Sequence, residues 1–146
     1  MKYPQTKAFG LIVNMVANKS RMEFSRELKK QGVSIKPEQS YMISLAAKNN
    51  GSVAMSEFTK DADFLGDKSR VSKMIKELID SGYCIRQEDP DDRRYMMLKL
   101  TNLGLETEKK IAEAYKIRFS VISSEFSDHE LEEFRAYLLR FLNILS

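Results

Sequence analysis

The sequence feature that most constrains the fold is the segment 83–101, which has a β-hairpin pattern in a chain whose other patterns are helical. Residues 84–87 and 95–100 contain bulky, β-competent side chains and predict two short strands. The segment between them, Glu-Asp-Pro-Asp-Asp, has the composition of a turn, and Arg93 and Arg94 follow it directly. The fold must therefore place one charged hairpin beside a set of helices.

Composition predicts a single domain with a substantial core, since the chain has 146 residues of which 42% are hydrophobic and 31% charged. Cys84 is the only cysteine, which rules out an internal disulfide and favours a reducing, cytoplasmic setting. No stretch approaches the roughly 20 apolar residues of a membrane span. The net charge is only +3, but the basic excess lies in residues 1–54 while the C-terminal part is acidic. This asymmetry is compatible with a nucleic-acid-binding face.

Helical periodicity and end signals divide the first half of the chain. A first helix is predicted over residues 4–30 and a second from Pro37 to about residue 48, before Asn49-Asn50-Gly51. Residues 52–54 form a connector or a strand. A third helix is expected from Ser56, which would cap it, although only Phe58, Ala62 and Leu65 contribute apolar side chains.

The predicted fourth helix begins after Asp67, an acidic N-cap, and ends at Ser81-Gly82. Its inward stripe is formed by Val71, Ile75, Leu78 and Ile79. A second face carries small polar and basic side chains at helical spacing, namely Ser69, Ser72, Lys73 and Lys76. The fourth helix is therefore amphipathic, with a polar face suited to close contact.

Two further helices follow the hairpin. Thr101 is a good N-cap for a fifth helix over residues 102–123, and residues 127–130 form a capping box that begins the sixth. The sixth helix carries a heptad-like apolar seam of Leu131, Phe134, Leu138, Phe141, Leu142 and Leu145. Such a seam favours packing against a partner chain. We therefore expect residues 1–34 and 102–146 to supply dimerisation helices around a compact unit of residues 35–101.

The order of elements in residues 35–101 is that of a winged helix-turn-helix, so the predicted fold is mainly α with a small β-hairpin wing. In this arrangement the second helix of the turn enters the DNA major groove and the hairpin reaches the minor groove or the backbone. The candidate DNA-binding residues are Lys68, Ser69, Arg70, Ser72, Lys73, Lys76, Arg93 and Arg94. Asp92 is expected to hold an arginine of the tip in place. The alternative is that these residues only form a solvated helix face and a turn of mixed charge.

The wing sequence resembles the signature of the MarR family of bacterial transcriptional regulators. The resemblance rests on Asp89-Pro90-Asp91-Asp92-Arg93-Arg94 and on Asp92-x-Arg94-x5-Leu100-Thr101. The run Asp67-Lys68-Ser69-Arg70-Val71-Ser72-Lys73, followed by Leu78, Gly82 and Arg86, is similar to the family's recognition helix and its exit into the wing. By motif the resemblance covers about residues 35–108.

The resemblance implies a homodimer whose terminal helices interlock and whose two wings meet a pseudo-palindromic operator. It also implies a repressor that a small ligand or oxidation releases from DNA. Arg94, with Arg93, would enter the minor groove, and Asp92 would orient it. The family's ligand pocket would here be lined by Phe9, Val13, Met42 and Tyr115, which are also ordinary core residues.

Three features depart from the family pattern. Lys36 stands where the family usually has a capping Thr or Ser, and the interval between Phe58 and Asp67 is longer than usual. Cys84 lies at the start of the wing, whereas the peroxide-sensing branch places its reactive cysteine in the first helix. We therefore interpret Cys84 as a small buried strand residue and not as a redox sensor.

No pattern favours an enzyme or a cofactor. The single histidine, His129, falls in the first turn of the last helix, and the sequence has no metal-binding cluster, glycine-rich phosphate loop or nucleophile motif. The rival to a DNA-binding regulator is a winged-helix module that binds proteins. The acidic residues around the wing tip, Glu88, Asp89, Asp91 and Asp92, support that rival.

Overall fold

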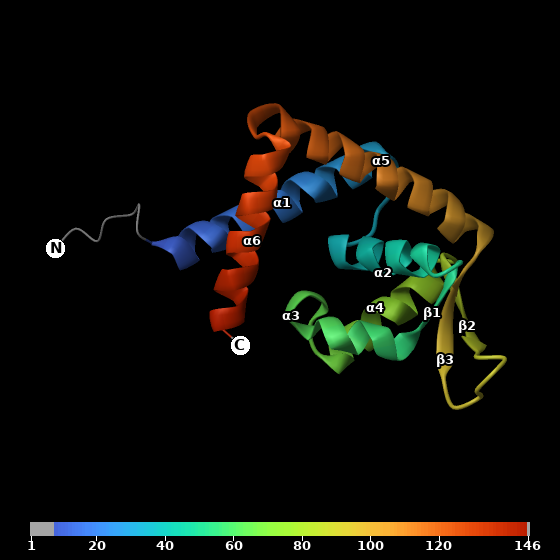
Figure 1. Cartoon of the computed structure of the whole chain (residues 1–146). Coiled ribbons are helices and arrows are strands. Elements are labelled where there is room, and N and C mark those ends of the chain that lie inside the picture. Colours follow the sequence, from blue (N-terminus) through green and yellow to red (C-terminus); the bar gives the residue numbers. More distant parts are fainter. Residues whose placement is uncertain (1–7, 146) are drawn as a thin grey trace.

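The computed structural model describes residues 8–145, and within them the chain is mainly helical with one small sheet (Figure 1). The elements in order are α1 (Phe9–Lys30), α2 (Pro37–Lys48), β1 (Ser52–Ala54), the 3-10 helix η2 (Met55–Asp61), α3 (Ala62–Leu65), α4 (Lys68–Asp80), β2 (Cys84–Glu88), β3 (Met96–Leu100), α5 (Asn102–Glu125) and α6 (Asp128–Ile144). This is the predicted fold class, a winged helix-turn-helix with long terminal helices.

The sheet is antiparallel with the strand order β1-β3-β2, so β3 is its central strand. Leu98 of β3 pairs with Val53 of β1 on one side and with Arg86 of β2 on the other. The predicted hairpin is confirmed, and residues 52–54 form a strand that completes the sheet. The hairpin tip projects away from the helices at the lower right of Figure 1.

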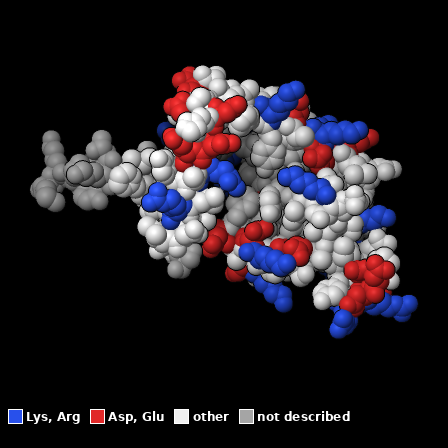
Figure 2. All heavy atoms as spheres, viewed as in Figure 1, with Lys and Arg blue, Asp and Glu red and all other residues white. Residues whose placement is uncertain are grey.

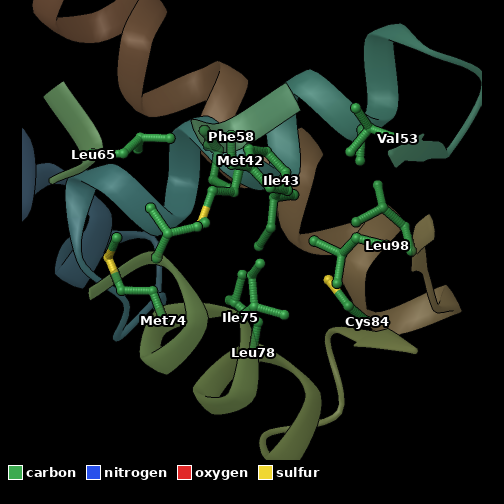
Figure 3. Packing of buried hydrophobic residues seen from close by; sticks show 14 of the residues in the cluster. Met42, Ile43, Val53, Phe58, Leu65, Met74, Ile75, Leu78, Cys84 and Leu98 are labelled. Carbon is green, nitrogen blue, oxygen red and sulfur yellow. The ribbon is translucent and has the colours of Figure 1, made fainter. Parts of the chain in front are cut away.

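The core lies between α2, η2, α4 and the sheet (Figure 3). Met42, Phe58, Met74 and Leu98 are each fully buried there. The terminal helices add to the same core, since Leu28 of α1 and Ile111 and Ala114 of α5 are also fully buried. Burial of these side chains supplies the main favourable term for folding and fixes the orientation of α4.

The predicted helix caps are present. The Asp67 carboxylate accepts a hydrogen bond from the Arg70 backbone N–H at 2.8 Å, and the Thr101 hydroxyl accepts one from the Gly104 N–H at 3.1 Å. Ser127 and Glu130 form the reciprocal capping box. At the start of α2, the Lys36 side chain makes no capping hydrogen bond, as expected for a lysine at a position where the family usually has Thr or Ser. Instead the Gln39 side chain accepts a hydrogen bond from the Lys36 N–H at 2.9 Å.

The predicted third α-helix is replaced by a 3-10 helix and a single α-helical turn. Ser56 does not cap an α-helix, because it lies inside the 3-10 helix η2, whose N-cap is Ala54. Only the single turn α3 is α-helical, and it ends at Gly66, where φ is 95°. Phe58 and Leu65 are the two fully buried anchors of this segment. Two anchors hold the segment against the core without imposing an α-helical period on the residues between them.

The bounds of two other helices also differ from the predictions. α5 continues to Glu125, beyond the predicted end at residue 123. α1 begins at Phe9, and the predicted start at residues 4–7 lies outside the described residues. No helix within residues 8–145 is long and apolar enough to cross a membrane.

The terminal helices leave large apolar faces uncovered. α5 runs beside α1, where the Phe24 and Tyr115 rings lie 4.3 Å apart, and α6 then turns back across α1 in the view of Figure 1. Within the described residues, α6 buries none of its side chains. Its exposed apolar residues include Phe134, Tyr137, Leu138, Leu139 and Leu142, and those of α1 include Phe9, Leu11, Ile12, Val13 and Val16.

Candidate nucleic-acid interface

α4 presents one polar face because its other face is fixed in the core. Val71, Met74, Ile75 and Leu78 are buried at helical spacing, which gives the helix a single allowed rotation. Met74 was absent from the predicted inward stripe and completes it. The opposite side is exposed and carries all six predicted residues of this helix, namely Lys68, Ser69, Arg70, Ser72, Lys73 and Lys76.

Two of the cations on α4 are already engaged within the protein. The Lys76 ammonium lies 2.6 Å from a carboxylate oxygen of Asp80, one turn later on the same helix. The Arg70 guanidinium lies 3.4 Å from a carboxylate oxygen of Glu38 on α2. The Lys76 pair has the i, i+4 spacing that a helical sequence reveals, whereas the Arg70 contact joins residues far apart in the chain.

The wing tip holds an arginine in the predicted manner. The Asp92 carboxylate accepts hydrogen bonds from Arg94 Nε at 3.0 Å and from Arg94 Nη2 at 2.7 Å, and also from the Arg94 backbone N–H at 3.1 Å. These hydrogen bonds lower the pKa of the Asp92 carboxyl and raise that of the Arg94 guanidinium. The Arg94 side chain remains 83% exposed. Arg94 is thus held in a fixed direction at the surface while its charge stays accessible.

The acidic residues of the tip also shape its backbone. The Asp89 carboxylate accepts a hydrogen bond from the Asp91 N–H at 2.9 Å, and the Asp89 N–H donates to the Tyr95 carbonyl at 3.0 Å. Figure 2 shows acidic and basic side chains side by side at this tip. Asp89 and Asp92 therefore use their carboxylates in local hydrogen bonds, which accounts for acidic residues beside Arg93 and Arg94 on one turn.

A hollow of about 520 Å³ lies beside α4, between η2, α3 and β2. Its lining includes Lys68 and Ser72 of α4, Ser56 and Thr59 of η2, and Arg86 of β2. Arg86 belongs to the sequence pattern that resembles the family but was not among the predicted DNA-binding residues, and the structure brings it next to the polar face of α4. Its place in the strand that follows α4 was the signal that could have made it a candidate residue.

Glu38 is the polar residue that sequence reasoning missed. It is 4% exposed, and two arginines from different helices contact its carboxylate. Arg21 of α1 donates through Nε to Oε1 at 2.9 Å and through Nη2 to Oε2 at 2.8 Å, and Arg70 of α4 makes the third contact. Burial alone would raise the pKa of Glu38, but the contacts with Arg21 and the charge of Arg70 outweigh it and lower that pKa.

The four residues predicted to line a ligand pocket do not share one cavity. Phe9 and Val13 line an apolar hollow of about 540 Å³ between α1 and α6, together with Phe134 and Leu138. Met42 is fully buried in the core of the winged unit, and Tyr115 stacks near Phe24. Met42 thus occupies an ordinary core position, which was the alternative interpretation.

The remaining candidate residues have structural surroundings. Cys84 is buried at the start of β2, and this burial raises the pKa of its thiol to about 12. His129 is exposed and lies 3.2 Å from Glu133 on the same helix. Among residues 8–145, no group of three or more His, Cys, Asp or Glu side chains is arranged to hold a metal ion.

Comparison with known proteins gives matches by structure alone. No family model and no curated protein matches the sequence. A mutant MarR from E. coli complexed with operator DNA matches with a TM-score of 0.76 and 17% identity, covering 97% of this chain and 98% of that one. The S. aureus MepR–DNA complex matches with a TM-score of 0.78 and 18% identity, over 93% and 97% of the two chains.

A third solved structure, an organohalide-sensing transcriptional regulator in its 2,4-dichlorophenol-bound form, has a TM-score of 0.80 and 15% identity, with coverage of 97% of this chain and 82% of that one. The first two of these proteins were solved in complex with DNA, and the third is described as a transcriptional regulator. The fold of this chain is therefore that of MarR-type regulators over nearly its whole length.

Proposed function

We propose that this chain, which has the MarR-type winged-helix fold, is a dimeric transcriptional regulator that binds a pseudo-palindromic operator. The observation that carries the proposal is the wing tip, where Asp92 holds the exposed Arg94 through three short hydrogen bonds. A guanidinium held in this way loses little conformational entropy when it binds DNA. Arg94, assisted by Arg93, enters the minor groove, where arginine favours narrow, electronegative sequences.

The polar face of α4 supplies the major-groove contacts in this proposal. Ser69 and Ser72 are small enough for close approach and can bond phosphates or base edges. Lys68 and Lys73 provide exposed positive charge on the same helix. Lys76 contributes less than Lys73, because its ammonium is already paired with Asp80.

The proposed dimer uses the terminal helices, residues 1–34 and 102–146, and leaves residues 35–101 as the DNA-binding unit. The support is the set of exposed apolar side chains on α1 and α6, which a lone chain leaves in water at a cost of roughly 25 cal/mol per Å². The apolar hollow between α1 and α6 is where a helix of the partner would pack. Two winged units joined in this way would reach half-sites ~34 Å apart.

Repression and release by a small molecule complete the proposal. The organohalide-sensing regulator with this fold was solved with 2,4-dichlorophenol bound, which supports an effector-responsive role for the present chain. The test is displacement of bound DNA by a panel of phenols and aromatic acids. A compound that lowers DNA affinity while leaving the dimer intact would support the role.

The proposed function is tested by fluorescence anisotropy with two duplexes, one carrying the region upstream of the gene and one of random sequence. We expect tighter binding to the upstream duplex and a mass of two chains by light scattering. Arg94→Ala should weaken binding by roughly tenfold or more, Arg93→Ala by less, and Lys110→Ala on α5 should leave it unchanged. Equal affinity of parent and Arg94→Ala would contradict the wing assignment.

The same assay distinguishes the proposed regulator from the rival function, a winged-helix module that binds proteins. A winged helix that serves only to bind other proteins would show no preference between the two duplexes. For the proposed regulator, Lys73→Ala should lower the slope of log affinity against log salt by about 1, and Lys76→Ala should lower it by less.

A further inference from the structure

Glu38 joins three helices through one buried carboxylate. It lies in the first turn of α2, and its side chain is only 6% exposed. Arg21 reaches it from α1 and Arg70 reaches it from α4. Because α1 is a terminal helix and α4 carries the polar face, this cluster is a direct polar connection between the two parts of the protein.

The two arginines contact the carboxylate differently. Arg21 forms a bidentate pair with both oxygens at 2.8–2.9 Å, the geometry that fixes a carboxylate most firmly. Arg70 makes one longer contact of 3.4 Å, and its side chain stays 47% exposed. Arg21 therefore anchors Glu38, while Arg70 keeps donors available for another partner.

The aliphatic part of the Arg70 side chain and its backbone also have defined surroundings. A side chain at Gly66 would place its Cβ 2.7 Å from Arg70 Cδ, so the glycine leaves the room in which this stem lies. The backbone N–H of Arg70 is fixed by the Asp67 cap. The Asp67 cap thus holds the backbone of Arg70, and the contact with Glu38 at 3.4 Å gives the guanidinium its direction. Two arginines against one carboxylate leave a net positive charge at this edge of α4.

We propose that Glu38 is a positioning residue for DNA binding, which holds Arg70 at the edge of α4 for a DNA phosphate and makes its direction depend on α1 through Arg21. This inference rests on the proposed function, because it requires that α4 faces DNA. A phosphate takes the free donors of Arg70, and the contact with Glu38 keeps the guanidinium from adopting other rotamers. A shift of α1 relative to α2 moves Arg21 and so disturbs the same contact.

The direction in which Glu38→Gln changes DNA affinity distinguishes a positioning role from a simple electrostatic effect. Removing a carboxylate next to the DNA-binding face raises the positive charge, which by itself strengthens binding to a polyanion. If Glu38 positions Arg70, its removal weakens binding instead. If Glu38 merely competes with DNA for Arg70, its removal strengthens binding. Of these two roles, positioning and competition, only positioning predicts a loss of affinity for Glu38→Gln.

The experiment measures the affinity of full-length parent and Glu38→Gln for a random-sequence duplex and for the upstream duplex over a salt series. We expect roughly tenfold weaker binding of Glu38→Gln to both duplexes, and a salt slope smaller by about 0.9. Glu77→Gln is the matched control, since Glu77 lies on α4, is 39% exposed and pairs with Lys36 at 3.7 Å. Its affinity should equal or exceed that of the parent.

A double-mutant cycle tests whether Glu38 acts through Arg70. In an Arg70→Gln background, Glu38→Gln should cause no further loss of DNA affinity, whereas a purely structural role would reduce affinity in both backgrounds. Arg21→Gln should reproduce part of the loss. Circular dichroism shows whether Glu38→Gln folds. If it does not, the Arg70→Lys variant provides the test, because lysine keeps the positive charge but lacks the planar guanidinium that can donate to Glu38 and a phosphate together. Parent-like binding by Arg70→Lys would then overturn the proposal.

The outcomes for the two proposals are separable. A parent that binds neither duplex overturns the proposed function and this inference together. A parent that prefers the upstream duplex, combined with a Glu38→Gln variant of unchanged or higher affinity, overturns the positioning role alone.

Discussion

The close contact at Gly104 gives a sharp prediction about stability. Gly104 lies in the first turn of α5, and a Cβ added there would lie 2.2 Å from the Tyr83 carbonyl oxygen and 3.3 Å from Leu100 Cβ. An ordinary contact begins at 3.4 Å, so the start of β2 and α5 would have to separate by more than about 1 Å. Gly104→Ala must therefore disturb the junction between the wing and α5.

The magnitude follows from the contacts at this junction. The Tyr83 carbonyl accepts a hydrogen bond from the Thr101 N–H at 3.1 Å, and the Thr101 hydroxyl donates to the adjacent Gly82 carbonyl at 2.6 Å, with Tyr83 O at 3.1 Å. Overpacking costs about 1–3 kcal/mol, and loss of the two hydrogen bonds costs about 1 kcal/mol each. The higher helix propensity of alanine than of glycine offsets about 1 kcal/mol of this destabilisation. We expect Gly104→Ala to lower the free energy of unfolding by about 2–4 kcal/mol.

The assay is urea unfolding followed by circular dichroism at one fixed protein concentration, since the stability of the proposed dimer would depend on concentration. The midpoint for Gly104→Ala should fall by about 1–2 M for an m-value near 2 kcal/mol/M. The matched control is Gly10→Ala on α1, where nothing lies within 4 Å of the added Cβ. It should be neutral or stabilising by up to about 1 kcal/mol. A Gly104→Ala protein as stable as the control would refute the reasoning.

Three further predictions concern other parts of the chain. Because burial raises the pKa of the Cys84 thiol to about 12, this thiol should react with a maleimide at pH 8 only after unfolding, as mass spectrometry would show. The folded-state pKa of Glu38 is lowered despite its burial, so its contribution to stability is present above the unfolded pKa of about 4.3 and is lost as pH falls below it. The stability difference between parent and Glu38→Gln should therefore shrink on acidification in urea titrations. Phe134→Asp on the exposed face of α6 should shift the mass measured by light scattering from two chains towards one, whereas Glu132→Asp should not.

Features encoded within a few residues were predictable from the sequence. The caps at Asp67, Thr101 and Ser127 each join a side chain to the backbone N–H three residues later, so the local sequence contains both partners. The same holds for the Asp92–Arg94 contact at the wing, whose partners are two residues apart. The Asp92–Arg94 contact was for this reason predictable from the sequence, while its role in DNA binding stays a prediction.

Features that depend on distant partners were not predictable. Glu38 meets Arg21 and Arg70 across separations of 17 and 32 residues, and no local pattern relates these positions. The prediction of a third α-helix from Ser56 was wrong for a related reason. Phe58 and Leu65 are held in place by the surrounding core and do not follow a helical period of their own segment. On α1 and α6 the apolar periodicity was as predicted, but one chain by itself does not bury those faces.

The length of α5 has a mechanical consequence for the wing. This helix has 24 residues and begins one residue after β3, with Thr101 alone between them. At 1.5 Å per residue it is a rod of about 36 Å, so a tilt of about 5° around its distal end displaces the wing by about 3 Å. Such a displacement exceeds the tolerance of a hydrogen bond to DNA. In the proposed DNA complex α5 would therefore act as a lever arm, because a small rotation where it meets α6 would change whether Arg94 reaches the minor groove.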